Sequence, residues 1–306
     1  MKLIFDISNI LFASYLMNYE DNFNDGFDVN DLENLVRSIT IRHMCYLLET
    51  FGTKWKDLII ATDSGSWRKD YYKFYKQNRR KSKKDSKIDF DIVYKFFDCF
   101  IKELKEILPS PVMKVYNCEA DDIIGTLALV LSKKEKVIIV SKDKDFIQLN
   151  SENIMLYDPF KKEFKNEVKI GSIKMEVNNE KDAKKYLLYH ILMGDSIDGI
   201  PNLKSDDDVF VDPLKRQKPF GIKTIQKKLK TKDDLKQLVD EYYDNWKRNS
   251  LLIDLKKIPK EYKEKIIDEY NNCLKNNLTK KLTNDIISKY CEEHNLYETE
   301  EIFKRF

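Results

Sequence analysis

The sequence predicts an α/β fold in which a mostly parallel central sheet is flanked by helices. Three short apolar runs, at residues 3–5, 58–61 and Val137–Val140, have the composition of strands that are buried on both faces. Amphipathic helical segments separate these runs along the chain. Strands and helices that alternate in this way form a sheet that helices cover on both sides.

The segments between the strands support this order. Residues Val29–Phe51 have the periodicity of an amphipathic helix, which ends at Gly52. A second helix is predicted over residues 89–108, where Pro109 ends it, and a fourth strand follows over residues 112–116. The chain then enters a third helix whose first turn is strongly acidic.

This acidic turn lies in the segment "YNCEADDIIGTLA", which places Glu119, Asp121 and Asp122 directly before an apolar run. Helix capping is one explanation, because unpaired N–H groups and the helix dipole attract negative charge. Three carboxylates exceed what a cap needs, and two of them about 5 Å apart repel by roughly 3 kcal/mol at an effective dielectric of 20. A bound cation is the other explanation, and it requires more acids to converge here.

Further acids follow the predicted strands. Asp6, Asp63, Asp143 and Asp145 each come within a few residues of a strand's carboxyl end. Ligands of α/β sheets bind at this edge, so we expect these side chains to meet the acidic helix there. Ligand sets made of oxygen alone indicate Mg²⁺ or Mn²⁺, and so many acids suggest two ions roughly 4 Å apart, as in enzymes that hydrolyse phosphate esters.

A second acidic group lies in "GDSIDGIP", where Asp195 and Asp198 follow a helical run over residues 183–192. Glycines and a proline mark this segment as a turn, and a hydrophilic loop is its simplest explanation. In combination with the other acids, the two aspartates could supply the remaining metal ligands.

A basic stretch begins five residues after Asp63. Residues 68–87, "RKDYYKFYKQNRRKSKKDSK", hold ten lysines and arginines and two aspartates, with four aromatic rings among them. A solvated charged segment is the ordinary explanation of such a run. Cationic side chains mixed with aromatic rings are suited to binding single-stranded nucleic acid. Metal ions in the acidic pocket would offset the repulsion between its carboxylates and a polyanionic substrate. We therefore favour a nucleic-acid phosphodiester as the substrate.

Charge and cysteine usage exclude several classes of protein. The 306 residues carry a net charge of only +3, so attraction to nucleic acid must come from local patches. Five scattered cysteines and three histidines show no zinc-site spacing, and they indicate buried, reduced thiols in a cytoplasmic protein. No apolar run approaches 18 residues and the chain begins directly with a strand, so we expect neither a membrane span nor a signal peptide.

Several motifs together resemble those of the flap-endonuclease/5′-nuclease superfamily, and most of all its phage branch, the ribonuclease H of T-even phages. They are "SWRKDYYKFYKQNR", "EADDIIGTLA", "SKDKDFIQL", "GDSIDGIP" and "LLIDLKKIP". The resemblance extends from Asp6 to Pro259, and the second and third motifs are highly specific as a pair. It implies a PIN/5′-nuclease-like fold.

The same resemblance implies three regions. Residues 1–180 form a metal-binding nuclease core that includes a helical arch over residues 64–90. Residues 181–230 form a DNA-binding region like a helix-three-turn-helix, and residues 231–306 form a helical C-terminal region. The tail "YETEEIFKRF" is either a final packed helix, which we favour, or a partner-binding segment.

Roles for individual residues also come from the resemblance. It assigns nine acids to two metal sites: Asp6, Asp63, Glu119, Asp121 and Asp122 to the first, and Asp143, Asp145, Asp195 and Asp198 to the second. The implied catalytic residues are Lys76, Arg79, Asp121 and Asp143. The implied nucleic-acid contacts are Arg68, Lys69, Tyr75, Lys76, Arg79, Arg80, Gly221, Lys223 and Thr224. For Tyr75, base stacking and core packing are equally good explanations.

One departure from the family pattern follows the Asp198 motif. Residues 203–219 intervene before "FGIKTIQKKL", so only Gly221, Lys223 and Thr224 remain of the family's G-I-G-x-K-T-A motif. Contact with duplex backbone stays plausible, whereas the family's K⁺ site is in doubt. The aspartate run 206–208 is expected to be a solvated loop and not a third metal site.

The expected function is a metal-dependent 5′→3′ exonuclease and flap endonuclease that removes RNA primers during phage DNA replication. The resemblance implies two Mg²⁺ ions, with Mn²⁺ as a substitute, and DNA or RNA–DNA hybrids with 5′ ends or flaps as substrates. It also implies a monomer, with a single-stranded-DNA-binding replication protein as a candidate partner. A PIN-type ribonuclease and a non-catalytic, structure-specific DNA-binding protein stay open as alternatives, although the basic stretch and the full set of acids argue against them.

Overall fold

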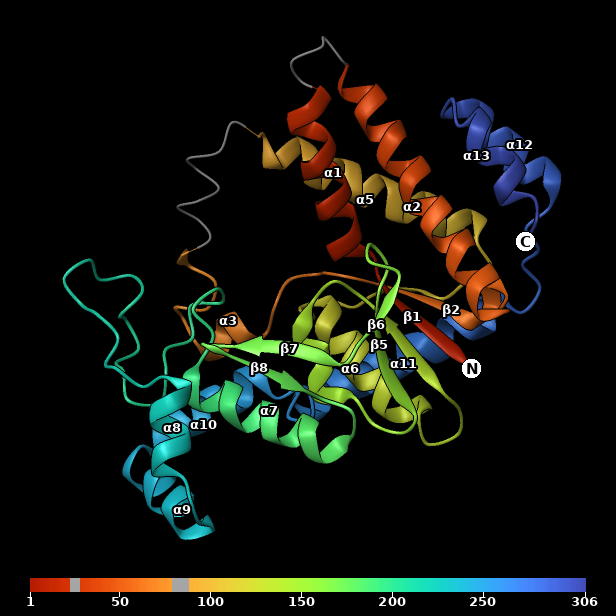
Figure 1. Cartoon of the computed structure of the whole chain (residues 1–306). Coiled ribbons are helices and arrows are strands. Elements are labelled where there is room, and N and C mark those ends of the chain that lie inside the picture. The colour runs from red at the N-terminus through yellow and green to blue at the C-terminus, as the bar shows by residue number, and fades with distance from the viewer. Residues whose placement is uncertain (23–27, 79–87) are drawn as a thin grey trace.

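The computed structural model, which describes residues 1–22, 28–78 and 88–306, contains the predicted sheet (Figure 1). Six strands lie in the order β3-β2-β1-β4-β5-β6, of which the first five are parallel and β6 is antiparallel to β5. The strands are β1 Lys2–Asp6, β2 Leu58–Thr62, β3 Val112–Lys114, β4 Val137–Val140, β5 Ile154–Asp158 and β6 Glu163–Lys165. A separate hairpin consists of β7 Glu167–Ile170 and β8 Ile173–Glu176.

The strand order reverses between β1 and β4. From β1 the chain builds one half of the sheet through β2 and β3, and it then returns to add β4 on the other side of β1. Such a switch point opens a crevice at the carboxyl ends of the central strands, because the connections on its two sides lead away from each other.

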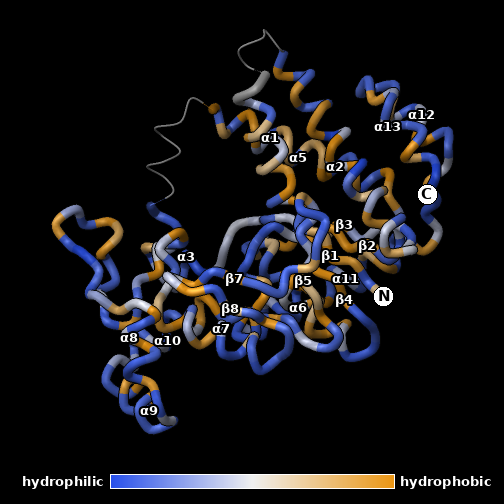
Figure 2. The backbone as a smooth tube through the Cα atoms, viewed as in Figure 1, coloured by the Kyte–Doolittle hydropathy of each residue, from blue (hydrophilic) through white to orange (hydrophobic). Residues whose placement is uncertain are grey.

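Helices cover both faces of the sheet (Figure 1). Ile4 and Ile59 face one hydrophobic core, whereas Leu3, Phe5 and Leu58 face the other, as the alternation of side chains along strands requires. Figure 2 shows the hydropathy of each residue along the backbone of the strands and helices. The first core packs against α6 Ala120–Leu131, α7 Glu180–Met193 and α11 Lys260–Asn277. The second packs against α1 Ile7–Asn22, α2 Val29–Phe51 and α5 Phe90–Ile107.

Of residues 64–90, the structure describes 64–78 and 88–90. The helix α3 Arg68–Tyr71 is a single turn, turns occupy residues 73–77, and residue 78 is helical at the edge of the described part. Residues 79–87 lie outside the described part of the chain, so the helical arch stays a prediction.

The C-terminal region is helical, as predicted. Its helices are α9 Lys232–Glu241, α10 Tyr243–Ile253, α11, α12 Asn284–Glu293 and α13 Tyr297–Phe303, and α8 Ile222–Lys228 directly precedes it. The tail packs as a final helix, because Phe303 is fully buried with its ring centroid 5.5 Å from that of Trp55. Thr299 Oγ1 also lies 2.6 Å from Ser38 Oγ on α2.

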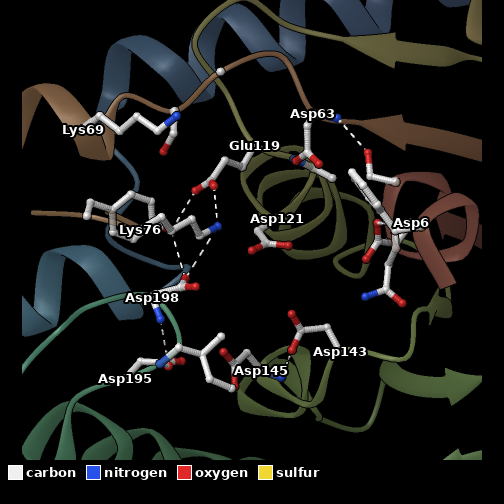
Figure 3. Close-up of a pocket in the computed structure, with 18 of the residues that line it drawn as sticks. Asp6, Asp63, Lys69, Lys76, Glu119, Asp121, Asp143, Asp145, Asp195 and Asp198 are labelled. Carbon is white, nitrogen blue, oxygen red and sulfur yellow. Dashed lines mark hydrogen bonds and ion pairs between the residues drawn. The ribbon is translucent and has the colours of Figure 1, made fainter. Parts of the chain in front are cut away.

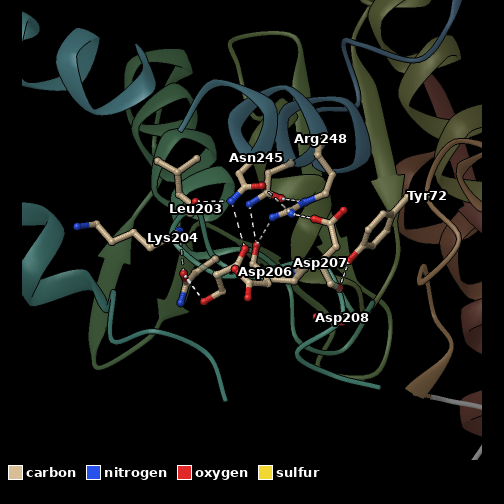
Figure 4. A network of polar contacts seen from close by, with 12 residues as sticks. Tyr72, Leu203, Lys204, Asp206, Asp207, Asp208, Asn245 and Arg248 are labelled. Carbon is tan, nitrogen blue, oxygen red and sulfur yellow. Dashed lines mark hydrogen bonds and ion pairs between the residues drawn. The ribbon is translucent and has the colours of Figure 1, made fainter. Parts of the chain in front are cut away.

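The segment 203–219 is a loop that is tied to α10 at its start (Figure 4). Tyr72 Oη donates to the carbonyl oxygen of Asp207 at 2.6 Å. The carboxylate of Asp207 pairs with Arg248, a buried residue of α10. Asp207 therefore has a structural role in a loop that was expected to be solvated throughout.

The five cysteines are free thiols, but Cys99 is exposed, contrary to the expectation that all are buried. Burial raises the pKa of Cys45 and Cys118 to about 12, so these thiols stay protonated. Across the residues that the structure describes, every helix is too short or too polar to cross a bilayer.

Candidate active site

An open cavity of ≈ 630 Å³ lies at the carboxyl ends of β1, β2 and β4, at the switch point of the sheet. Eight of the nine predicted acids line it (Figure 3). They are Asp6, Asp63, Glu119, Asp121, Asp143, Asp145, Asp195 and Asp198. Positions separated by up to 192 residues thus converge, as the strand-end argument predicted.

Short hydrogen bonds orient the acids at the strand ends. Ser141 Oγ donates to Asp6 Oδ2 at 2.7 Å and accepts the N–H of Asp143 at 3.0 Å, so one hydroxyl links two of the acids. Asp6 Oδ1 accepts the N–H of Asn9 in the first turn of α1 at 3.1 Å. The Asp6 carboxylate is therefore held in place before any ion binds, and Ser141 also fixes the backbone at Asp143.

Burial and mutual repulsion oppose ionisation of the acids at the centre of the cavity. Burial, reinforced by nearby carboxylates, raises the pKa of Asp6 to about 7 and that of Asp143 to about 6. Burial and the charge of Asp143 raise the pKa of Asp121 well above its ordinary value. Within the described residues no hydrogen-bond donor contacts the Asp121 carboxylate. Divalent cations would supply the missing counter-charge, and a donor set of carboxylate oxygens fits Mg²⁺ or Mn²⁺.

Glu119 differs from its neighbours because protein cations already neutralise it. Lys76 Nζ lies 2.5 Å from Oε1, while Arg68 Nη1 at 3.2 Å and Tyr75 Oη at 2.9 Å contact Oε2. Burial alone would raise the pKa of Glu119, but Lys76 and Arg68 lower it to about 2. In this conformation Glu119 is the least available of the eight carboxylates as a metal ligand.

Lys76 is held at the cavity wall by its backbone as well as by its side chain. Its φ of 56° places it in the left-handed region, which is uncommon for a residue with a side chain. Its N–H donates to the carbonyl oxygen of Asp198 at 2.8 Å, and Nζ lies 3.6 Å from Asp198 Oδ2. The lysine thus bridges the Glu119 side of the cavity and the second acidic group.

Three predicted site residues support the structure around the cavity. Arg68 is 2% exposed, pairs with Asp122 at 2.8 Å and does not line the cavity. Asp122 does not line the cavity either, and its Oδ2 accepts the N–H of Glu119 at 2.9 Å as a helix cap. Tyr75 lines the cavity but is 4% exposed with its hydroxyl bonded to Glu119, so its ring is packed against the protein, and stacking on a base stays a prediction.

The remaining predicted contacts lie at several places. Lys69 is exposed and lines the cavity. Arg79 and Arg80 lie outside the described residues. Gly221 precedes α8, and the exposed Lys223 and Thr224 lie in its first turn, away from the cavity wall.

The second acidic group contains a histidine that sequence reasoning missed. His190 of α7 is 5% exposed, with Nδ1 3.8 Å from Asp145 Oδ1 and Nε2 3.4 Å from Asp195 Oδ2. Burial opposes a charge on the imidazole, but Asp145 and Asp195 raise its pKa above the ordinary value. The sequence offered one signal for this histidine, which is its position five residues before Asp195. In a helix, residues 186 and 190 point to the same face.

Two aromatic side chains on the cavity wall were also missed. Phe12 of α1 and Tyr94 of α5 pack edge to face, with ring centroids 5.6 Å apart, and Tyr94 is 38% exposed. They form an apolar wall beside the acids. Helix α1 was not predicted, which is why Phe12 was not considered.

Comparisons with known proteins agree with this geometry. A family model described as "5'-3' exonuclease, N-terminal resolvase-like domain" matches residues 1–183, and one described as "T4 RNase H, C terminal" matches residues 182–300. The ribonuclease H of Enterobacteria phage T4 is 28% identical over 275 residues, which cover 88% of this chain and 86% of that protein. The flap endonuclease Xni of Shewanella sp. (strain MR-4) is 30% identical over 179 residues, which cover 58% of this chain and 62% of that protein.

Solved structures share the fold. The bacteriophage T5 D15 protein, co-crystallised with metal ions, superposes with a TM-score of 0.58 at 14% identity and covers 89% of this chain and 98% of that one. A complex of the T5 D15 flap endonuclease with DNA and metal ions gives a TM-score of 0.56, also at 14% identity, over 89% and 98% of the two chains. Because the first family model alone matches more than half of its residues, the chain belongs to the 5′–3′ exonuclease family and is a structure-specific 5′ nuclease.

Proposed function

We propose that the protein is a metal-dependent 5′→3′ exonuclease and flap endonuclease that acts on DNA and RNA–DNA hybrids and removes RNA primers during DNA replication. The single observation that carries the proposal is the cavity itself, in which eight carboxylates meet and burial and mutual repulsion raise the pKa of the central ones. Phage replication is the setting that the similarity to the T4 enzyme supports.

Two Mg²⁺ ions, with Mn²⁺ as a substitute, are the proposed cofactors. Asp6, Asp63 and Asp121 would hold the first, and Asp143, Asp145, Asp195 and Asp198 would surround the second. When bound, such ions stabilise negative charge on the attacking and leaving oxygens of an in-line displacement. The protein contributes by fixing the carboxylates in advance, as Ser141 and Asn9 do for Asp6.

Lys76 is the proposed electrostatic catalyst. It points into the cavity and is bound to Glu119 and Asp198, so an incoming phosphate can take the place of a carboxylate as its partner. The exchange would bring positive charge to the phosphate and release Glu119 toward the first ion. Arg79 is assigned the same function by the family resemblance.

Substrate contacts are proposed on two sides of the cavity. Lys69 would bind backbone phosphate, and the apolar wall of Phe12 and Tyr94 would contact the base or sugar beside the cleaved bond. The exposed first turn of α8, with Lys223 and Thr224, would contact the duplex farther away. A K⁺ site there remains doubtful because the segment 203–219 interrupts the motif.

The three regions at 1–180, 181–230 and 231–306 are proposed as core, duplex-binding region and C-terminal region, with support from the two family models that meet at residues 182–183. We propose that the protein works as a monomer in the cytoplasm of the host cell. A single-stranded-DNA-binding replication protein is the proposed partner.

A panel of 5′-labelled substrates tests the function. Flap, nicked duplex, RNA–DNA hybrid and hairpin substrates are incubated with purified protein in Mg²⁺, and we expect short 5′ products from the flap and the hybrid. Asp121→Asn and Asp143→Asn should abolish cleavage while binding is largely retained. Asp206→Asn, in the exposed loop, is the matched control. Strong cleavage in excess EDTA would contradict the proposal.

A further inference from the structure

His190 occupies the floor of the second acidic group. Its ring lies between two carboxylates, with Nδ1 facing Asp145 and Nε2 facing Asp195. One ligand atom from each of the three residues can be chosen so that all lie within 4.8 Å of one another. Among the described residues, this is the group of histidine and acidic side chains whose ligand atoms lie this close together.

One imidazole nitrogen has no hydrogen-bond partner among the described residues. Nδ1 is fully buried, and its 3.8 Å separation from Asp145 Oδ1 is too long for a hydrogen bond. Buried polar atoms are rarely left in this state, and an unsatisfied one in a native structure calls for an unseen partner. The distance between Nδ1 and Asp145 Oδ1 suits two ligands of one ion, because such ligands lie about 3–4 Å apart when each is roughly 2.1 Å from the metal.

The surroundings leave room for that partner. A void of ≈ 30 Å³, about the size of one water molecule, is lined by His190 together with Asp145, Asp195 and Asp198. Asp145 is oriented by Tyr186, whose hydroxyl donates to Oδ1 at 3.1 Å, and Asp195 Oδ1 accepts the N–H of Ile197 at 2.8 Å. Both carboxylates are thus held toward the histidine.

The contact to Asp195 fixes which nitrogen is available. Nε2 lies 3.4 Å from Asp195 Oδ2, so a proton on Nε2 would face that carboxylate and leave the lone pair on Nδ1. Carboxylates commonly orient metal-binding histidines in this way. The first acidic group has only carboxylate oxygens, so the two halves of the cavity differ in donor chemistry.

We propose that His190 is a ligand of the second cation site, through Nδ1, and that this site therefore prefers a transition-metal ion such as Mn²⁺ over Mg²⁺. The inference rests on the proposed function, because it refines the identity of one of the two ions. Imidazole nitrogen binds transition ions more strongly than Mg²⁺, whereas the oxygen ligands of the first site suit Mg²⁺. The protein would then work with two different metals.

Pulsed electron paramagnetic resonance of bound Mn²⁺ tests the proposal without any measurement of cleavage. The full-length protein is loaded with one equivalent of Mn²⁺ in excess Mg²⁺, and we expect ¹⁴N modulation from a directly bound imidazole. Labelling the histidines of the unmodified protein with ¹⁵N should replace the ¹⁴N modulation by that of ¹⁵N. The result therefore does not depend on whether a variant folds.

Variants then identify the histidine. His190→Gln should remove the nitrogen signal and weaken Mn²⁺ binding by about tenfold or more, the size of effect common at metal sites, while Mg²⁺ affinity changes less. His43→Gln, in α2 and outside the lining of this cavity, is the matched control and should change neither. Bound Mn²⁺ without nitrogen modulation overturns the inference alone. Failure of the native protein to bind Mn²⁺ at all overturns the metal-dependent function as well.

Discussion

At the scale of single residues, three adjacent acids with the same chemistry have three different roles. Asp121 faces the cavity and receives no hydrogen bond from the described residues, Glu119 pairs with Lys76 and Arg68, and Asp122 caps α6 and pairs with Arg68. The difference arises because successive residues of a helix point about 100° apart. Capping, one of the two explanations that the sequence left open, therefore belongs to Asp122, whereas metal binding stays a proposal for Asp121.

Arg68 and Lys69 offer a matched pair of substitutions. Arg68→Met should lower the free energy of unfolding by about 3–5 kcal/mol, because it leaves Asp122 buried without a partner. Lys69→Met should leave stability nearly unchanged and weaken DNA binding, since Lys69 is exposed at the cavity. Chemical denaturation and a DNA titration measure the two effects. A stable Arg68→Met protein with weak DNA binding would restore the role that the sequence suggested.

Lys76→Ala should lower kcat more than it changes the affinity for substrate. The lysine is placed to stabilise charge that develops during the reaction, and losing such a group costs roughly 10²–10³-fold in kcat. Single-turnover cleavage of a labelled flap separates the two parameters. Lys73→Ala, an exposed lysine of the same segment, serves as the control. An equal loss in both variants would indicate general electrostatic attraction.

At the scale of elements, the turn after α7 determines where the second acidic group lies. Gly194 has φ 69° and ψ −174°, a combination that is essentially restricted to glycine. A Cβ atom there would overlap the backbone oxygens of Ile200 and Pro201. The next residue is Asp195, so the glycine directs the chain into the cavity.

Gly194→Ala should therefore destabilise the protein by about 1–3 kcal/mol or more and displace Asp195. Gly52→Ala is the control, because Gly52 is also left-handed at φ 59° but has open space around it. Thermal unfolding compares stability, and Mn²⁺ titration reports the second site. If both variants lose stability equally and bind Mn²⁺ normally, the turn has no special function.

Element boundaries could be predicted where the sequence marks them. Helix α2 matches its predicted range and α5 lies within one residue of it, because Gly52 and Asp89 are strong capping signals. Helix α1 was missed because it follows β1 without a turn and has no clear polar face. Contacts such as that of His190 with Asp145 depend on the packing of α7, which spacing along the chain does not encode.

At the scale of the whole molecule, the metal-free cavity makes stability depend on pH. Asp6 and Asp143 keep protons up to pKa values of about 7 and about 6, whereas in the unfolded chain they release them near pH 4. The folded protein then binds more protons than the unfolded one between these values, so the free energy of unfolding falls as pH rises from about 4 to 7. Glu119 and Asp195, with pKa values of about 2, are ionised throughout this window.

Mg²⁺ should oppose this trend. The ion competes with protons for the same oxygens, so it should raise the melting temperature more at pH 8 than at pH 5. A free Mg²⁺ concentration 100-fold above the dissociation constant raises the free energy of unfolding by about 2.7 kcal/mol. Calorimetry in Mg²⁺, with KCl of matched ionic strength as the control, measures the difference. A shift that does not vary with pH, or an unchanged shift in Asp121→Asn, would show that the ion binds elsewhere.

The sheet order also has a consequence for biosynthesis. A ribosome delivers Asp6 first and Asp198 nearly two hundred residues later, after every strand of the sheet has been synthesised. A nascent chain released before α7 would carry six of the eight cavity acids and the whole sheet, but it would lack Asp195, Asp198 and the turn at Gly194. We therefore expect such a truncated product not to cleave the nucleic acid that encodes it.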